Sequence, residues 1–305
     1  YFAHFLIIMP VLGYVEKTKP VPLSIADPII SGSGNLAAAK KDKNLNLIMK
    51  KFFITIFFSF ICFNLYAAGD AAKPLKVDWS FNGLFGKFDR SQLQRGFQVY
   101  KEVCASCHSM QYLSYRNLGE KGGPEFSDAE VKAIAAGYQI KDGPNEEGEM
   151  FERAGLPKDK FKSPHPNEKA ARAVNGGAYP PDMSVLVKAR AGGANYIYSI
   201  LMGYDENPPA NLKLEDGVYY NKYMPGNKIK MAKPLNEGSV EYADGTKATV
   251  SQMSKDVTAF LTWSAEPHLE KRKRIGFKTI VYLLIFSILV FFSMKKIWSR
   301  IETKV

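Results

Sequence analysis

The sequence predicts a mostly α-helical domain with long loops, followed by one C-terminal transmembrane helix. Two segments, 91–103 and 249–263, repeat apolar residues at helical spacing, and strand-like alternation is rare between them. The run 275–294 is apolar and long enough to cross a bilayer. Another apolar run, 52–65, directly follows two lysines and is typical of a secretory signal. We therefore expect an exported helical domain with a membrane anchor.

Two segments directly precede the predicted domain. Residues 31–48 form a linker of polar, charged and small residues. Residues 49–68 carry the parts of a signal peptide: a Lys-Lys start, an apolar stretch and the small residues Ala67 and Ala68 at the end. An uncleaved anchor is the alternative, because a clean Ala-x-Ala cleavage pattern is missing. Cys62 lies in this segment and would be removed with it.

The formal net charge of +11 does not indicate nucleic-acid binding, because the charge is unevenly distributed. Residues 69–270 contain 25 Lys and Arg against 26 Asp and Glu. The positive excess lies in the first 68 and last 35 residues, where it flanks the apolar segments. We therefore expect membrane lipid, and no nucleic acid, among the partners.

The segment 104–108 is CASCH and directly follows the first helix. Cys-x-x-Cys-His is the attachment pattern of c-type haem. The thiols of Cys104 and Cys107 can add across the two vinyl groups of one porphyrin, and the imidazole of His108 can then bind the iron. We expect one covalently attached haem c, with His108 as an axial ligand of the iron.

Two other kinds of site also use a Cys-x-x-Cys pair. A zinc site needs a second pair of ligands, and the only other cysteine is Cys62. A thioredoxin-like dithiol belongs to a strand–helix pattern, and none surrounds this motif. Haem attachment is therefore favoured, but these residues do not decide the sixth ligand of the iron. Met110 is too close to His108 in sequence to reach the opposite haem face, which leaves several of the ten methionines as candidates.

The remaining elements of the domain follow in chain order. Residues 119–182 are rich in Pro and Gly and are expected to be largely loop, and residues 214–248 short strands and turns. Between them, 183–190 and 194–202 are expected to form a pair of helices, the second ended by Gly203. Thr249 and Gln252 predict a capping box that begins the last helix of the domain. Gly96 leaves room for this helix to cross the first one closely, as in class I cytochromes c.

The anchor 275–294 is about 30 Å long as a helix, which matches one bilayer core. Four basic residues precede it and four follow it, so the positive-inside rule gives no orientation. The predicted signal peptide gives the orientation. The anchor is expected in a bacterial inner membrane, with residues 69–270 in the periplasm and residues 295–305 in the cytoplasm.

Five stretches of the domain resemble the cytochrome c1 family, in the order found in that family and over nearly all of residues 75–300. Upstream, residues 1–30 end an apolar run with GYVEKTKP and resemble the last transmembrane helix and tail of cytochrome b. The whole chain thus resembles part of a fused cytochrome b/c1 polypeptide, with read-through across a gene boundary as the alternative. The five stretches are RGFQVYKEVCASCHSMQYLSYRNL, DGPNEEGEMFERAG, AYPPDMSVLVKARAGGANYIYSILMGY, YNKYMPGNKIKMAKPL and DGTKATVSQMSKDVTAFLTWSAEP.

The resemblance implies the rest of the haem site. Met231, in IKMAKP, matches the axial methionine of the family, so that the iron would be closed and six-coordinate. Met224, in YMPG, is the nearest competitor, but the family does not use that position, nor that of Met183 in PPDM. Arg190 and Tyr196 fall where the family holds the haem propionates. His165 and His268, each beside a proline, are expected to be solvated loop residues.

The resemblance also implies a function. It is that of the haem subunit of quinol:cytochrome c oxidoreductase, the dimeric cytochrome bc1 complex. This subunit passes electrons from the Rieske iron–sulfur protein to a soluble or tethered cytochrome c, does no bond chemistry itself, and docks its anchor on cytochrome b. The alternatives are a free-standing anchored electron shuttle, or a haem enzyme or gas sensor with an open sixth position. Glu146, Glu147, Glu149 and Glu152 are either a solvated surface or a docking site for a basic cytochrome c.

Overall fold

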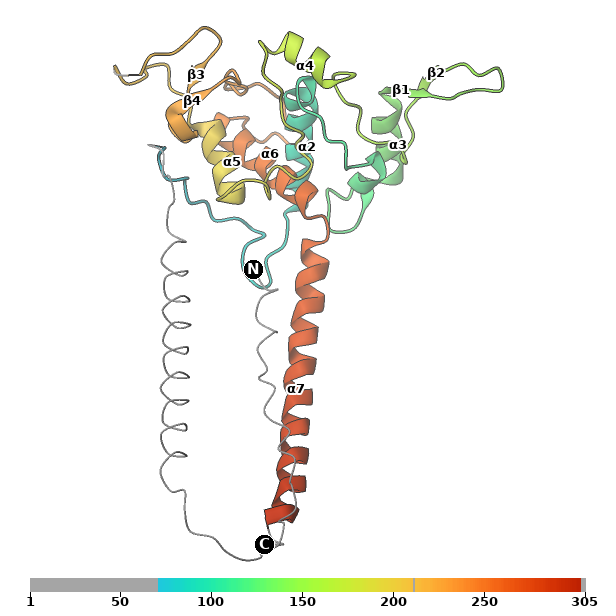
Figure 1. Ribbon diagram of the computed structural model, residues 1–305. Coiled ribbons are helices and arrows are strands. Elements are labelled where there is room, and N and C mark those ends of the chain that lie inside the picture. Colours follow the sequence, from blue (N-terminus) through green and yellow to red (C-terminus); the bar gives the residue numbers. More distant parts are fainter. Residues whose placement is uncertain (1–70, 211, 303–305) are drawn as a thin grey trace, which may run out of the picture. The chain divides into compact units, whose positions relative to one another are not determined.

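The computed structural model describes residues 71–210 and 212–302, which belong to one compact unit, Ala68–Val305. The predicted cytochrome b segment, linker and signal peptide therefore lie outside the described residues. Within the described part the fold is mostly helical with short strands, and it ends in one long apolar helix (Figure 1). The predicted fold class is confirmed.

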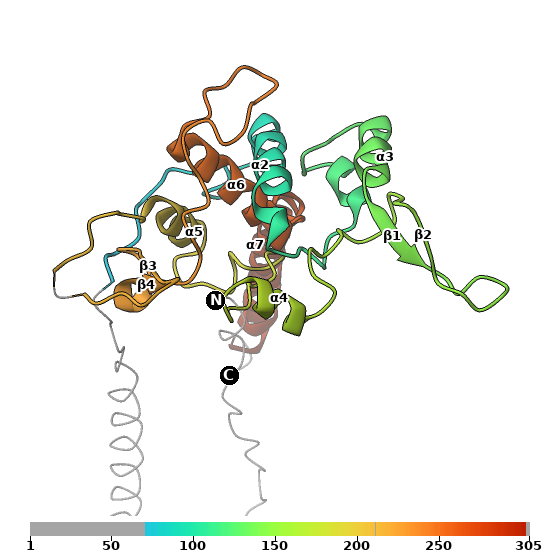
Figure 2. The ribbon, with the colours of Figure 1, turned by 90° about the horizontal axis from the view of Figure 1, so that it is seen from above.

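The two long helices of the domain are α2, Arg90–Glu102, and α6, Val250–Ala265, and they pack against each other (Figure 2). The approach is close at Gly96, where a Cβ atom would lie 2.1 Å from the carbonyl oxygen of Asp256. Thr249 caps α6 by accepting a hydrogen bond from the Gln252 amide. The Gln252 side chain donates to Asp256 instead of completing the capping box. The two predicted helices and their close crossing are confirmed. The predicted capping box is only half right, because the Gln252 side chain does not bond back to the Thr249 amide.

An aromatic core surrounds this crossing. The Phe260 ring of α6 lies 5.7 Å from that of Phe97 and 5.9 Å from that of Tyr100, both on α2. Phe161, from a loop far along the chain, lies 6.1 Å from Tyr100. These buried rings fix the end of α2, which is where the Cys-x-x-Cys-His motif begins.

The region 119–182 is more ordered than the sequence prediction allows. It contains α3, Asp128–Ala136, the antiparallel hairpin of β1, Gln139–Asp142, and β2, Phe151–Ala154, and the short helix α4, Glu168–Val174. Ser127 and Glu130 form a complete capping box at the start of α3. That box is visible in the sequence and would have predicted the helix.

The predicted helix over 183–190 is wrong, because this segment is a series of turns. The Ala189 amide is shared between the carbonyls of Val185 and Leu186, and Gly192 follows at a φ of +87°. The second helix of the predicted pair is present as α5, Gly193–Met202, and ends at Gly203 as expected. The last short elements are η3, Tyr115–Gly119, β3, Tyr219–Tyr220, η4, Pro225–Asn227, and β4, Lys228–Ile229.

The C-terminal helix α7, Leu269–Glu302, begins against the domain and continues as an exposed apolar helix (Figure 1). In the described part of the chain, α7 is the helix whose length and composition suit a membrane span. Its large apolar side chains from Ile275 to Trp298 are exposed to an extent that water would penalise. The transmembrane prediction agrees with this helix.

Candidate haem site

The Cys-x-x-Cys-His motif forms a tight turn at the end of α2. Cys104 begins the short helix η2, Cys104–Ser106, and its carbonyl accepts hydrogen bonds from the amides of Cys107, at 3.2 Å, and His108, at 2.9 Å. Cys104 is buried and Cys107 is exposed. The turn thus holds both thiols and the imidazole within one short stretch of backbone. That arrangement suits attachment to a single porphyrin edge.

The orientation of the His108 ring follows from one hydrogen bond. Its Nδ1 lies 2.8 Å from the carbonyl oxygen of Pro181, and since a carbonyl only accepts, Nδ1 carries the proton and donates it. Nε2 is then the nitrogen with a free lone pair. Burial lowers the pKa of His108 and opposes protonation of that nitrogen. A neutral imidazole with a fixed Nδ1–H is the form that binds metals in proteins.

The segment that supplies the Pro181 carbonyl is held in place by Asp182. One oxygen of its carboxylate accepts from the Ser109 hydroxyl, at 2.8 Å, and from the Gln111 amide, at 2.9 Å. The other oxygen accepts from the Ser184 amide at 2.8 Å. Asp182 therefore fastens the backbone beyond His108 to the segment that orients His108. Asp182 is not among the predicted site residues, and its place directly after two prolines is the one local signal that the sequence contains.

Met231 belongs to a separate set of contacts. Met231 lies two residues after the end of β4. Its carbonyl oxygen accepts a hydrogen bond of 3.0 Å from the Tyr204 hydroxyl. Burial raises the pKa of Tyr204, so that this phenol remains a donor. Tyr204 in turn pairs with Asn221 through an isolated β-bridge. The backbone of Met231, a half-buried residue, is thus fixed by contacts that do not include the motif at 104–108.

The predicted propionate residues lie together at the start of α5. Tyr196 is half-buried, and burial raises its pKa. The charge of the exposed Arg190 opposes this increase but is the smaller effect. The Tyr196 hydroxyl donates to the sulfur of Met224 at 3.5 Å. The structure therefore brings Tyr196 and Met224 together, whereas the hydrogen bond of the Arg190 side chain goes to the carbonyl of its neighbour Ala189. The motif at 104–108 is held instead by the segment 181–184.

His165 is placed differently from the expectation of a solvated loop residue. It is half-buried, and its Nε2 is buried without a hydrogen-bond partner within the described part of the chain. It lines a cavity with Cys107, Ser109, Asn167 and Tyr179. A buried polar atom without a partner, in a cavity that Cys107 also lines, fits a site that is completed by a bound group. The donor set, with one exposed thiol, one free imidazole nitrogen and this cavity, fits a haem.

Residues 71–210 and 212–302 contain no group of three or more His, Cys, Asp or Glu side chains that could hold a metal ion by themselves.

Comparison with known proteins gives one consistent result. The model of the cytochrome C1 family matches residues 79–301. A protein of Bradyrhizobium diazoefficiens named cytochrome b/c1 is 47% identical over 98% of this chain. The chain spans 45% of the length of that relative. The match over nearly all of the chain agrees with the predicted resemblance to a fused polypeptide.

Shorter relatives match about three quarters of the chain. The mitochondrial haem protein cytochrome c1-2 of Solanum tuberosum is 48% identical over 74% of this chain and 85% of its own length. A protein of Candida albicans named cytochrome b-c1 complex catalytic subunit is 44% identical over 78% of this chain and 82% of its own length.

Proposed function

The chain belongs to the cytochrome c1 family, and from this we propose that it carries one haem c and passes electrons within a cytochrome bc1 complex. Electrons would come from the Rieske iron–sulfur protein and leave to a soluble or tethered cytochrome c. The observation that carries the proposal is the hydrogen bond from His108 Nδ1 to the Pro181 carbonyl, which leaves Nε2 free beside the two motif cysteines. When bound, the haem supplies a one-electron carrier.

We assign the residues of the site as follows. Cys104 and Cys107 would attach the haem, and the side chains of His108 and Met231 would bind its iron. Pro181 fixes the tautomer and the orientation of His108, and Asp182 holds Pro181 in place. Tyr204 holds the backbone of Met231. Arg190 and Tyr196 face the propionates, since buried carboxylates need charged or hydrogen-bonding partners.

These assignments make the site suitable for electron transfer. With His108 and Met231 both bound to the iron, substrates and gases would be excluded from it. Because both ligands come from backbone segments that hydrogen bonds hold in place, little rearrangement is needed when the charge of the site changes. A thioether ligand favours the reduced state more than a second histidine would.

The partners of this subunit are also proposals. Cytochrome b would contact α7, and two complexes would associate as a dimer. The acidic residues Glu146, Glu147, Glu149 and Glu152 are all exposed, on the loop and second strand of the β1–β2 hairpin. Their charge suits the encounter with a basic cytochrome c, which it would mainly accelerate.

We place the haem domain in the periplasm, with α7 in the inner membrane and the C-terminus in the cytoplasm. The support is the predicted signal segment 49–68 and the length and apolar composition of α7. A haem attached through cysteines outside the cytoplasm is consistent with this orientation.

The test of the proposed function is purification in mild detergent followed by identification of the co-purifying chains. We expect cytochrome b and a Rieske protein, and a haem that stays on the chain after denaturation. The reduced protein should not bind carbon monoxide. A protein that purifies alone and still reduces a cytochrome c would indicate a free-standing shuttle, and carbon monoxide binding would indicate an open site.

A further inference from the structure

The turn between Phe81 and Phe88 presents two large apolar side chains outward. Leu84 is 55% exposed and Phe85 is 71% exposed, which makes Phe85 the most exposed large apolar residue of the described chain. Their neighbours Phe81 and Phe88 are buried, and their rings lie 5.0 Å apart. The apolar pair is therefore at the tip of an ordered turn whose base belongs to the core.

The turn is tightly built. Gly83 has a φ of +71°, and a Cβ atom at Gly86 would lie 1.8 Å from the carbonyl oxygen of Asn82. The Lys87 amide closes the turn by donating to the Ser80 carbonyl at 3.0 Å. At the tip of this closed turn, Leu84 and Phe85 point outward, as their exposure shows.

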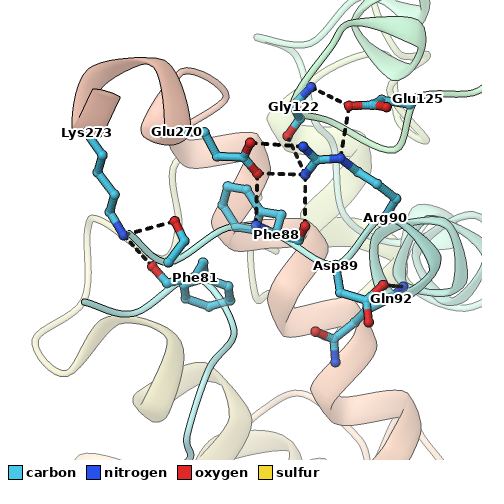
Figure 3. Close-up of polar contacts among 10 residues, drawn as sticks. Phe81, Phe88, Asp89, Arg90, Gln92, Gly122, Glu125, Glu270 and Lys273 are labelled. Atoms are coloured by element: carbon cyan, nitrogen blue, oxygen red, sulfur yellow. Dashed lines mark hydrogen bonds and ion pairs between the residues drawn. The ribbon is translucent and has the colours of Figure 1, made fainter. Parts of the chain in front are cut away.

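Lys273, in the first turns of α7, ties this turn to the membrane helix. Its Nζ donates to the carbonyls of Phe81 and Gly83, each at 2.6 Å (Figure 3). Beside it, Glu270 accepts from both Nη atoms of Arg90 and from the Phe88 amide, so that both ends of the turn are fixed to α7 (Figure 3). The side chain of Glu270 is only 11% exposed.

The tip lies level with the start of the apolar part of α7. The Phe85 ring contacts the ring of Phe277 edge-on, with centroids 5.5 Å apart. Phe277 comes two residues after Ile275, where the apolar run begins, which is about 3 Å along a helix axis. Phe85 therefore lies at the depth where the hydrocarbon of a bilayer spanned by α7 would begin.

We propose that the turn of residues 82–86 is a second membrane contact, with Leu84 and Phe85 inserted at the boundary between headgroups and acyl chains. The surface is continuous with the exposed apolar face of α7, and lipid is the medium that this helix requires. Lys87, two residues after Phe85, and Lys278, which follows Phe277, are both exposed and can reach the headgroups. Aromatic and basic residues are enriched at this depth in membrane proteins.

The contact would fix how the domain stands on the membrane. A single helix leaves a domain free to tilt about one point, whereas two contacts joined through Lys273 and Glu270 restrict that tilt. The haem domain would then be held at one height above the bilayer.

A spin label tests the insertion. Phe85→Cys is labelled with a nitroxide in the full chain, purified with its co-purifying subunits and reconstituted in phosphatidylcholine–phosphatidylglycerol vesicles. We expect collisions with oxygen to exceed collisions with a water-soluble nickel complex, giving a ratio several-fold above that of the same label at Phe151→Cys. Phe151 is 43% exposed on β2, at the hairpin, and serves as the aqueous reference.

Leu84→Cys is the second labelling position, and retention of the reduced haem spectrum shows that each variant is folded. If the nickel complex reaches the labels at residues 84 and 85 as readily as the label at residue 151, the tip lies in water and the proposal is overturned. A label shielded from oxygen and nickel alike would mean that a protein subunit covers the tip, which also overturns it. Neither result would bear on the electron-transfer function, because the haem spectrum reports that site separately.

Discussion

His108 and Asp182 show how much of the site depends on single side chains. One carbonyl selects the tautomer of His108, and one carboxylate with three hydrogen bonds fixes the segment that carries this carbonyl. The thiols and the imidazole were predictable because the motif lies in five consecutive residues. Asp182 was not, because two of its three partners, Ser109 and Gln111, lie 73 and 71 residues away in sequence.

Met231→Leu tests the axial ligand. We expect the haem to stay covalently bound, because Cys104, Cys107 and His108 are unchanged, and the reduced protein to acquire carbon monoxide binding. The reduction potential should fall, because water or a lysine amine favours ferric iron where a thioether favours ferrous iron. Axial ligands move haem potentials over a range of about 0.8 V, so a redox titration will detect the change.

Met224→Leu is the matched control for this prediction. Its sulfur accepts a hydrogen bond from Tyr196, so its loss should change the surroundings of Tyr196 and leave the iron ligation intact. If the Met224 variant instead acquires carbon monoxide binding while the Met231 variant does not, the two assignments must be exchanged.

Asp182→Ala should loosen the support of His108. Hydrogen bonds to a charged group contribute about 2 kcal/mol, so we expect the free energy of unfolding to fall by at least that amount. The measurement is a guanidinium titration of the detergent-solubilised protein, followed by the haem spectrum. Asp216→Ala, at an exposed position of a loop, is the control and should leave the midpoint unchanged. Equal midpoints for the two variants would mean that Asp182 does not hold the Pro181 segment.

At the scale of elements, local signals predicted those helices whose ends are encoded nearby. Thr249 marked the start of α6 and Gly203 the end of α5. The turns at 183–190 differ from the helix that the sequence analysis predicts there. The Asp182 carboxylate accepts a local hydrogen bond from the Ser184 amide, and the Met183 amide donates to the distant Ser109 carbonyl. Periodicity in one segment carries no information on such distant partners.

Gly96→Ala tests the crossing of α2 and α6. A Cβ atom there would lie 2.1 Å from the Asp256 oxygen and 2.7 Å from the Phe260 Cβ, so the helices must separate. Overpacking of this kind costs about 1–3 kcal/mol, against a gain of up to about 1 kcal/mol from the helix propensity of alanine. We expect a lower thermal midpoint of the haem domain.

Gly137→Ala is the control for the crossing. Gly137 ends α3 at a φ of −67°, and a Cβ atom would meet its nearest neighbour at 3.4 Å, an ordinary contact. This variant should be as stable as the parent. A Gly96 variant that is equally stable would show that the helices can separate without loss, contrary to the close packing described above.

At the scale of the whole molecule, the boundary between domain and anchor differs from the one that composition suggests. The sequence places the end of the domain at residue 270, where the charge balance changes. The structure places Glu270 and Lys273 within α7, yet both bind the domain, through Arg90, the Phe88 amide and the carbonyls of Phe81 and Gly83. The first turns of the anchor helix are therefore part of the folded domain.

This boundary predicts a difference between two truncated chains, one ending after Arg274 and one ending after Leu269. The first keeps the contacts of Glu270 and Lys273, and we expect it to be exported as a soluble, reducible, haem-loaded domain that does not assemble with cytochrome b. The second leaves Arg90 without its bidentate partner and the Phe88 amide without its acceptor. We expect it to be less stable by on the order of 2 kcal/mol, the usual cost of losing hydrogen bonds to a charged group.

Guanidinium titrations of both soluble domains measure this difference in stability. Two substitutions in the longer domain, Lys273→Met and Lys271→Met, then test how much of it comes from the contacts of Lys273. Lys271→Met is the control: Lys271 is exposed, and its substitution removes the same charge as Lys273→Met without affecting the turn at residues 81–88. Lys273→Met should lower the midpoint because the carbonyls of Phe81 and Gly83 lose their common donor. Coincident titrations of the two truncated chains would place the domain boundary before Leu269. A longer chain that stays in the membrane would place it within the apolar run.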